Sequence, residues 1–396
     1  MEPSDGLDIV RLRQDTPGVQ NRIHFNNAGM SLPPGPVLDT VITHLRREAE
    51  IGGYEAAEEA AGRVESVYAS VARLLHADPS EIALVENATI GWLLAFHTIP
   101  FQAGDRILTA RAEYASNYIS YIQVGQRRGV SVETVPSLPT GEVDVEALER
   151  MIDGRVRLIA ITHVPTNGGL VNPAEEIGRI ARRHGILYLV DACQSAGQLP
   201  LDVRRLGCDM LSATGRKYLR GPRGTGVLYV RRGLVEALEP PLLDMRAATW
   251  VAPDRVEMRP DAKRFENWEK NWGGFLGLGA AIDYALGLGL QAIEARVSPL
   301  AERLREGLAA LPGVEVRDLG RRRCGIVSFT EANRPAAAVK AALAANAINV
   351  TVSQPSSTLL DALARRLPDV VRASVHYYND EAEICRFLAA LRQSIG

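Results

Sequence analysis

Apolar and polar positions alternate along the first two thirds of the chain in a way that predicts strands and helices in turn. Short aliphatic runs predict buried strands, and the longer stretches between them carry one apolar face, which is typical of helices. The predicted strands are 81–85, 105–108, 130–135, 158–162, 186–190 and 208–213. The predicted helices are 87–96, 117–128, 143–152 and one that Pro173 begins and Gly185 ends.

This alternation predicts a large α/β domain. Strands that alternate with helices of about 10–15 residues favour a parallel sheet with helices on both faces. Strands that are apolar throughout fit burial on both sides. In such a sheet, ligands bind at the carboxyl ends of the strands, so candidate chemistry is sought there.

The pattern changes in the last third of the chain, which predicts a small α+β domain. The elements expected there are helices at 290–311 and 336–345, strands at 314–316, 326–329 and 348–352, and a closing helix from Asp380. We therefore expect three parts: an N-terminal segment, 1–50, whose helix at 37–50 packs on the small domain, a large domain, 51–285, and a small domain, 286–396.

Composition narrows the class of protein. The chain has 396 residues, 46% of them hydrophobic, so it can bury a large core. The formal net charge of −2, from 45 basic and 47 acidic residues, argues against binding to nucleic acid. No apolar run is long enough to span a membrane, and residues 1–5 do not begin a signal peptide, so a cytoplasmic protein is expected.

Cysteine and histidine spacing predicts no metal site. The 4 cysteines form no C-x-x-C pair, and the 7 histidines have no H-x-x-x-H spacing, although metal ligands commonly follow such patterns. Free thiols in a reducing compartment are the expected state of the cysteines.

Two charged residues after successive predicted strands carry the candidate chemistry. The strand at 186–190 ends on Asp191, and Lys217 follows 26 residues later in the turn Thr-Gly-Arg-Lys, before a Gly-Pro-Arg-Gly segment. Pyridoxal phosphate (PLP) enzymes need a lysine that bonds to the cofactor aldehyde and a carboxylate that keeps the ring nitrogen protonated. Each residue alone has an ordinary explanation, as a helix cap or a solvated loop cation. Their order and spacing together predict a PLP site.

A candidate phosphate site supports this interpretation. Asn87 opens a predicted helix directly after a strand, and a helix N-terminus presents free N–H groups to an anion. Ala88 and Thr89 are therefore expected to bind the cofactor phosphate, although Thr89 alone also suits a plain helix cap.

Three segments resemble a known family. They are 24–29 (His-Phe-Asn-Asn-Ala-Gly), the block that runs from Asp191 through Lys217 to Gly224, and 371–379. The chain resembles class V aminotransferase-type enzymes of PLP fold type I, a group that includes cysteine desulfurases, isopenicillin N epimerase and kynureninase. The resemblance implies an α/β large domain with a mostly parallel mixed sheet, a small C-terminal α+β domain, an amino-acid substrate and a homodimer with active sites at the subunit interface.

The resemblance also implies roles for single residues. Lys217 holds the cofactor and moves the α-proton, Asp191 pairs with the ring nitrogen, and Gln194 donates to the phenolic oxygen. Arg372 binds the substrate α-carboxylate, for which a guanidinium is well shaped. The other expected cofactor contacts are Tyr114 on the ring face where relatives have histidine, Thr214 and Arg216 at the phosphate, and His163 and Asn167 at a strand end. The other expected substrate contacts are Asn27, Tyr54 and Ser353.

Departures from the family shape the functional expectation. Desulfurases need a mobile cysteine before the carboxylate-binding arginine, and the segment 353–357 reads Ser-Gln-Pro-Ser-Ser. The usual Gly-Thr after Arg-Phe-Glu is also missing, which places the cross-subunit phosphate contact in doubt. The segment 46–57, Tyr114 and the segment 215–224 resemble the ergothioneine-pathway C–S lyase.

A C–S β-lyase that cleaves a cysteine-derived thioether or sulfoxide is therefore preferred. A class V aminotransferase or an epimerase remains an alternative, because loss of the α-proton serves all three reactions. A persulfide-forming cysteine desulfurase ranks lower. A non-catalytic interaction protein on the same scaffold is disfavoured by the intact Lys217 and Asp191.

Overall fold

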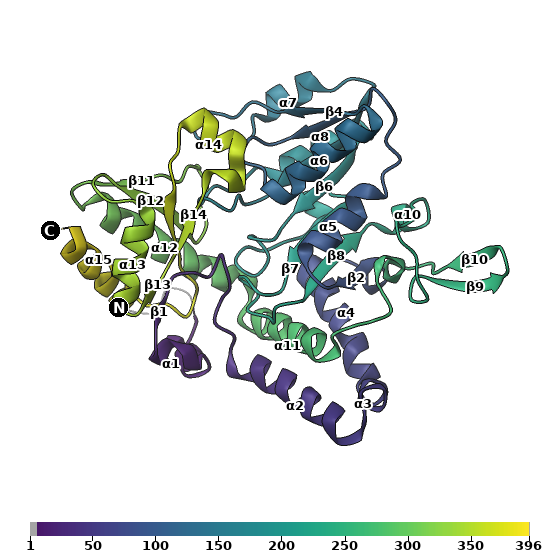
Figure 1. Ribbon diagram of the computed structural model, residues 1–396, viewed down its shortest axis with the longest axis horizontal. Coiled ribbons are helices and arrows are strands. Elements are labelled where there is room, and N and C mark those ends of the chain that lie inside the picture. The colour runs from purple at the N-terminus through teal and green to yellow at the C-terminus, as the bar shows by residue number, and fades with distance from the viewer. Residues whose placement is uncertain (1–5, 396) are drawn as a thin grey trace.

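Seven strands form the central sheet of the large domain, in the order β2-β8-β7-β6-β5-β3-β4. Figure 1 shows the computed structural model, which describes residues 6–395. The strands are β2 (Ile82–Val85), β3 (Arg106–Thr109), β4 (Ser131–Thr134), β5 (Val156–Thr162), β6 (Leu187–Asp191), β7 (Met210–Thr214) and β8 (Gly226–Val230). Only β8 runs against the others, because it is antiparallel to both of its neighbours, β2 and β7. The predicted mostly parallel mixed sheet is confirmed.

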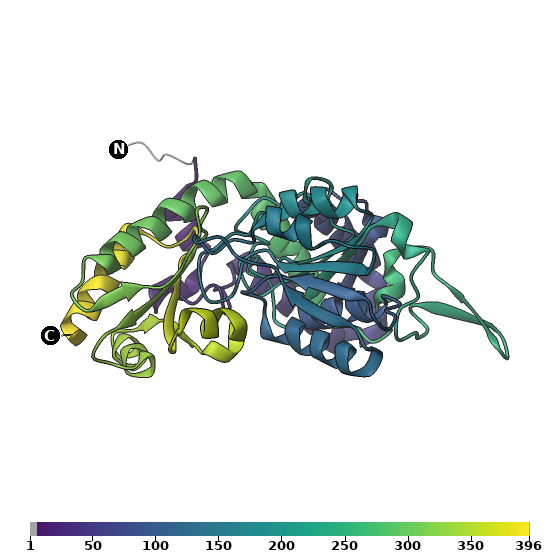
Figure 2. The ribbon, with the colours of Figure 1, turned by 90° about the horizontal axis from the view of Figure 1, so that it is seen from above.

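Helices cover both faces of this sheet, as the view from above in Figure 2 shows. They include α4 (Ala61–Leu75), α5 (Ala88–His97), α6 (Ala115–Arg128), α7 (Val145–Met151), α8 (Ala174–Arg183), α9 (Val203–Leu206) and α11 (Trp272–Leu288). Because both faces are covered, the strand interiors are dry, and Ile159, Leu189 and Leu211 are all 0% exposed. This burial explains why the strands read as apolar throughout.

The small domain is built on a four-stranded antiparallel sheet, in the order β11-β12-β15-β14. Its strands are β11 (Val314–Val316), β12 (Ile326–Glu331), β14 (Thr351–Ser353) and β15 (Val370–Ser374), and its helices are α12 (Leu290–Ala309), α13 (Ala336–Ala345), α14 (Leu359–Arg365) and α15 (Glu381–Ile395). The strand predicted at 348–352 is divided, since β13 (Ile348–Asn349) leaves this sheet to pair with β1 (Ile23–His24).

The prediction that the N-terminal helix packs on the small domain was wrong. The helix α2 (Gly35–Ile51) lies along α11 instead. Glycine allows this close approach, since a Cβ added to Gly277 of α11 would lie 2.5 Å from Cγ2 of Val41. Residues before α2 reach the small domain, where β1 pairs with β13.

Some elements were not predicted. Besides α4, α9, α11, α14, β1 and β8, they are α1 (Ile9–Gln14), α3 (Gly53–Glu59), α10 (Arg232–Val235) and a hairpin of β9 (Ala248–Ala252) with β10 (Arg255–Met258). The hairpin extends away from the rest of the large domain in Figure 1, and Trp250 on it is 76% exposed.

No single helix among the described residues is long and apolar enough to cross a membrane. The helices α11 and α12 meet that test only as a pair, and they are bent by 80° at their junction. Residues 1–5, on which the expectation about a signal peptide rests, lie outside the described residues.

Candidate active site

The predicted chemistry falls on one edge of the large sheet. The carboxyl ends of β5, β6 and β7 lie side by side, with Thr162 opposite Asp191 and Asp191 opposite Ser212. Lys217 follows the end of β7 and lies close enough to Asp191 for their charges to interact. The fold therefore brings the predicted acid and the predicted lysine together at the edge where ligands of such sheets bind.

Lys217 presents an amine that is suited to attack a carbonyl. Its side chain is half-buried, and its amine has no hydrogen bond or ion pair within residues 6–395. Burial lowers the pKa of this amine, and the charges of Cys193 and Asp191 oppose that shift. The backbone is fixed as well, because the N–H of Arg220 donates to the Lys217 carbonyl at 2.9 Å. A deprotonated, positioned amine is the form that bonds to an aldehyde.

Asp191 is a buried acceptor without a cation. It is 5% exposed. Its Oδ1 accepts from the backbone N–H of Cys193 and its Oδ2 from the side-chain amide of Asn117, both at 2.9 Å. No Lys, Arg or His within the described part of the chain forms an ion pair with it. Because a buried carboxylate is costly without a counter-charge, a cationic group from a ligand suits this position.

The first turn of α5 offers an anion site beside β7. Asn87 caps the helix with its side chain, whereas the N–H groups of Ala88 and Thr89 have no hydrogen-bond partner among residues 6–395. Ser212 of β7 donates its hydroxyl to the Ala88 carbonyl at 2.8 Å, which ties the helix start to the strand that leads to the lysine. Thr214, at the end of the same strand, is 6% exposed. Free N–H groups at a helix start favour phosphate.

Arg372 of β15 brings a small-domain side chain to the same crevice, where its charge acts on Lys217. It is 6% exposed, and its Nη1 donates to the carbonyl and the hydroxyl of Thr166 at 2.9 and 2.7 Å. Its Nε is buried without a hydrogen-bond partner. Burial lowers the pKa of Arg372 to about 10. The edge that carries Nε is the side of a guanidinium that binds a carboxylate with two hydrogen bonds.

Gln194 and Tyr114 lie between these two ends. The Nε2 of Gln194 donates to the Ala28 carbonyl at 3.1 Å and to the Thr166 hydroxyl at 3.4 Å, and its Oε1 is buried without a partner. Tyr114 caps α6, is 36% exposed, and acts electrostatically on Arg372. This exposure is larger than a tyrosine buried in the core under the helix would have.

Arg216 points to a different end of the crevice from the one expected. Its Nη1 donates to the carbonyl of Gly29, next to the Ala28 that holds Gln194. Burial lowers the pKa of Arg216, and the charge of Tyr114 opposes that shift. The guanidinium is therefore occupied by the Gly29 carbonyl and lies close enough to Arg372 for their charges to interact, and its expected contact with the phosphate stays a prediction.

Five other predicted residues take different places. His163 lines a separate cavity with Glu142 and Arg322, and burial lowers its pKa to about 4. The side-chain amide of Asn27 bonds to Ser374 and Tyr378, and Asn167 donates to Thr358 at 2.9 Å. Tyr54 is 79% exposed and lies beside Trp268, and Ser353 is buried in β14. Asn27 has no free donor for a substrate, because its amide hydrogens are already taken.

Two residues of the site were missed. Asn117 holds Asp191, and Glu113 holds Asn117 at 2.9 Å. Thr166, which its place beside Asn167 after a strand end made a candidate contact, holds Arg372 and Gln194. The available signal for the missed pair was spacing, since Glu113 and Asn117 stand four residues apart across the start of a predicted helix.

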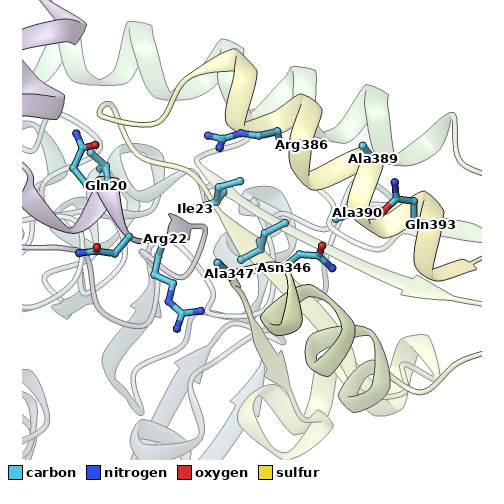
Figure 3. A pocket seen from close by; sticks show the side chains of 12 residues that line it. Gln20, Arg22, Ile23, Asn346, Ala347, Arg386, Ala389, Ala390 and Gln393 are labelled. Atoms are coloured by element: carbon cyan, nitrogen blue, oxygen red, sulfur yellow. The ribbon is translucent and has the colours of Figure 1, made fainter.

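A second cavity does not compete for the chemistry. Figure 3 shows a cavity of about 340 Å³ on the small domain, where the guanidinium groups of Arg22 and Arg386 point in different directions. None of the predicted site residues lines it.

The crevice fits PLP. An unpartnered amine, a buried carboxylate without a cation, free N–H groups at a helix start and orphaned polar atoms on Gln194 and Arg372 match the aldehyde, ring nitrogen, phosphate and polar substituents of that cofactor. This combination on an α/β sheet defines a PLP-dependent enzyme.

The chain belongs to the aminotransferase class-V family, whose model matches residues 23–387. A probable cysteine desulfurase of Xylella fastidiosa (strain 9a5c) is 32% identical over 98% of this chain and 96% of its own length. The apo structure of cysteine desulfurase from Thermococcus onnurineus NA1 has a TM-score of 0.91 and is 29% identical, with 98% of each chain covered.

A third relative, C-DES, is similar over almost the whole chain. One solved structure, described as the cystine C–S lyase with its product cysteine persulfide, is 27% identical with a TM-score of 0.86, covering 95% of this chain and 99% of that one. Another, a mutant with glycine covalently linked to the PLP cofactor, is 26% identical with a TM-score of 0.87, covering 96% and 98%. PLP is therefore the cofactor of this fold and family.

The preference for a C–S β-lyase over a cysteine desulfurase was wrong. Curated relatives at 32% and 30% identity, which match nearly the whole chain, are named probable cysteine desulfurase. The similar structure from Thermococcus onnurineus NA1 is named cysteine desulfurase. The aminotransferase and epimerase alternatives are not favoured either. The error arose because the missing cysteine at 353–357 was taken to rank the desulfurase activity below a C–S lyase.

Proposed function

We propose that the protein removes sulfur from L-cysteine with PLP as its cofactor. The names of the relatives support this activity. The single structural observation that carries it is the free Nε edge of Arg372, a buried guanidinium without a carboxylate partner that shares the crevice with Lys217. In this proposal, a small α-amino acid presents its carboxylate to Arg372 and its Cα–H to Lys217.

Each residue of the crevice has one task in this proposal. Arg372 binds the α-carboxylate through two charge-assisted hydrogen bonds. Lys217, whose amine pKa is lowered by burial, takes the proton from Cα. Asp191 holds the ring nitrogen, and Ala88 and Thr89 hold the phosphate. Bound PLP supplies a protonated ring that accepts the electron pair left at Cα.

The sulfur acceptor in this proposal is a thiol from outside the crevice. Residues 353–357 contain no cysteine, and the thiol beside Lys217 is Cys193. Burial raises the pKa of Cys193, so little of its reactive thiolate exists near neutral pH. L-Cysteine and a thiol RSH then give L-alanine and RSSH. The Cβ–S bond breaks, an S–S bond forms, and Cβ takes up a proton.

Product analysis tests this proposal. The protein is reconstituted with PLP and incubated with L-cysteine and dithiothreitol, and alanine, sulfide, pyruvate and ammonia are measured. We expect alanine and sulfide in equal amounts. Pyruvate and ammonia without alanine would overturn the proposal. Lys217→Ala should abolish both products, whereas Lys340→Ala, on the exposed side of α13, is the matched control.

We also propose a homodimer in a reducing cytoplasm. The family resemblance supports the dimer, and the four free cysteines suit a reducing compartment. Gel filtration with light scattering should give twice the chain mass of 43.0 kDa, and a fully active monomer would contradict this.

A further inference from the structure

A second buried carboxylate lies behind Asp191. Glu113 is 3% exposed, and no Lys, Arg or His of residues 6–395 forms an ion pair with it. Asn117, also 3% exposed, joins the two acids, because its Nδ2 donates to Oε1 of Glu113 and to Oδ2 of Asp191, both at 2.9 Å. An amide nitrogen carries two hydrogens, so each carboxylate receives one of them.

The remaining contacts of Glu113 require an acceptor. Its Oε2 accepts from the Thr109 hydroxyl at 3.0 Å and from the Thr162 N–H at 3.1 Å. Its Oε1 accepts from the Tyr114 N–H at 2.9 Å and from the Thr162 hydroxyl. Two of these donors are backbone N–H groups, which cannot reverse their direction. A glutamine amide in this position would therefore turn its own N–H toward another donor.

No Lys, Arg or His of residues 6–395 is among the groups that most affect the charge of Glu113. The ionisable groups that face it are Asp191 on β6 and the phenol of Tyr121 on α6, whose side chain is 0% exposed. Burial raises the pKa of Glu113 to about 7, and the hydrogen bonds from Thr162 and Asn117 oppose that shift. Two buried carboxyl groups that share one bridging amide are therefore left without an ion-pair partner among residues 6–395.

We propose that Glu113 is a positioning residue for the cofactor: through Asn117 it holds the Asp191 carboxylate against the ring nitrogen and helps to keep that nitrogen protonated. The inference rests on the proposed role of Asp191. The protonated ring supplies the positive charge that the two acids lack, and the second negative charge strengthens the hold on the ring proton. Asn117 fixes one oxygen of Asp191 and Cys193 the other, so the carboxylate cannot rotate away.

Two variants separate the charge from the bridge. Glu113→Gln removes the second charge and disturbs its donors, whereas Asn117→Ala cuts the bridge and leaves both acids. The dissociation constant of PLP and the ¹⁵N resonance of ring-labelled PLP are measured for each holoenzyme. Both variants should bind PLP about tenfold more weakly or worse, and their ¹⁵N resonance should move toward the neutral pyridine position, since one buried charge or its alignment is worth about one pKa unit or more.

The matched control is another buried glutamate outside the crevice. Glu266 accepts from the Tyr68 hydroxyl and from the Leu84 N–H, both at 2.8 Å. Glu266→Gln should lower the melting temperature but leave the ¹⁵N resonance unchanged. If Glu113 had a purely structural role, Glu113→Gln would give this same result. Wild-type values of both measurements in Glu113→Gln and Asn117→Ala would overturn the inference. If Glu113→Gln does not fold, Asn117→Ala alone decides in the same way.

Failure of the proposed function has a different signature. A wild-type protein that binds no PLP, or whose bound ring nitrogen is unprotonated, contradicts the role of Asp191 itself. A wild-type protein that binds PLP with a protonated ring, together with unaffected variants, contradicts only the role of Glu113.

Discussion

Replacement of Arg372 by methionine tests the substrate site most directly. The guanidinium is 6% exposed, and Thr166 occupies only its Nη1, which leaves the Nε edge for the substrate carboxylate. Two charge-assisted hydrogen bonds at about 1.5–3 kcal/mol each amount to roughly 3–6 kcal/mol. We therefore expect Arg372→Met to raise the KM for L-cysteine by about 10²–10⁴-fold.

The effect should fall on KM rather than on kcat. The carboxylate is bound in the ground state and in the transition state alike, and the loss of such uniform binding leaves kcat nearly unchanged. The visible absorbance of bound PLP should also be unchanged, because Arg372 holds Thr166 and not the ring. Arg386→Met, on the exposed face of α15, is the control with a wild-type KM.

A substrate without the carboxylate completes the test. Cysteamine is L-cysteine without its α-carboxylate, so the wild-type enzyme should handle it about as poorly as Arg372→Met handles L-cysteine. The variant should lose nothing further with cysteamine, since the two changes remove the same contact. If Arg372→Met changed the KM for L-cysteine less than threefold, or weakened turnover of both substrates equally, the carboxylate would bind elsewhere.

The pH dependence gives an independent check on the same residue. Burial lowers the pKa of Arg372 from its ordinary value to about 10, so the guanidinium is cationic below that pH and loses its charge above it. The KM for L-cysteine should therefore be insensitive to this group below about pH 9 and rise about tenfold per pH unit above pH 10. Arg372→Met should lack that rise.

Three further outcomes are expected. Lys217→Ala should lose turnover while PLP stays bound through its phosphate and ring contacts, and borohydride reduction with peptide mapping of the wild type should label Lys217 and no other lysine. Glu266→Gln should lower the free energy of unfolding in urea by about 3–5 kcal/mol, because it leaves the buried ammonium of Lys270 without its partner; a loss below about 1 kcal/mol would show that the pair is dispensable. Iodoacetamide at pH 8 should label the exposed Cys385 first, since burial raises the pKa of Cys324 to about 11, and rapid labelling of Cys324 would contradict this.

The sequence was sufficient for residues whose place follows from a strand end. Asp191 is the last residue of β6 and Lys217 follows Thr214, the last residue of β7, by three positions, and parallel neighbours in a sheet end at the same edge. Side-chain direction was harder to predict. Thr162 and His163 are adjacent at the end of β5, yet the Thr162 hydroxyl donates to Glu113 and His163 lines another cavity. Successive side chains of a strand point to opposite faces, so one of two neighbours had to leave the crevice.

Contacts between distant segments were beyond a single sequence. Arg216 meets Gly29 from 187 positions away, and Asn27 meets Ser374 from 347. The helix α2 was assigned to the wrong neighbour because Gly277 shows no apolar signal, although its missing side chain is what admits Val41. The functional error was of another kind. One absent cysteine was given more weight than the resemblance of the whole chain.

The charges of the crevice are divided in a way that suits its chemistry. Asn117 joins Glu113 to Asp191, and no carboxylate of residues 6–395 pairs with the guanidinium of Arg372 or Arg216. In the proposed function, the two acids lie behind the ring nitrogen and the two guanidinium groups lie on the substrate side. A cationic ring and an anionic substrate carboxylate each complete one half of this arrangement. In the proposed function, a carboxylate bound at Arg372 would orient Cα toward the amine of Lys217, and the two acids would hold the ring proton that draws electrons away from Cα. The bond that this field weakens is Cα–H, which is why both the carboxylate end and the buried acids are expected to affect the reaction, the first through KM and the second through the state of the ring.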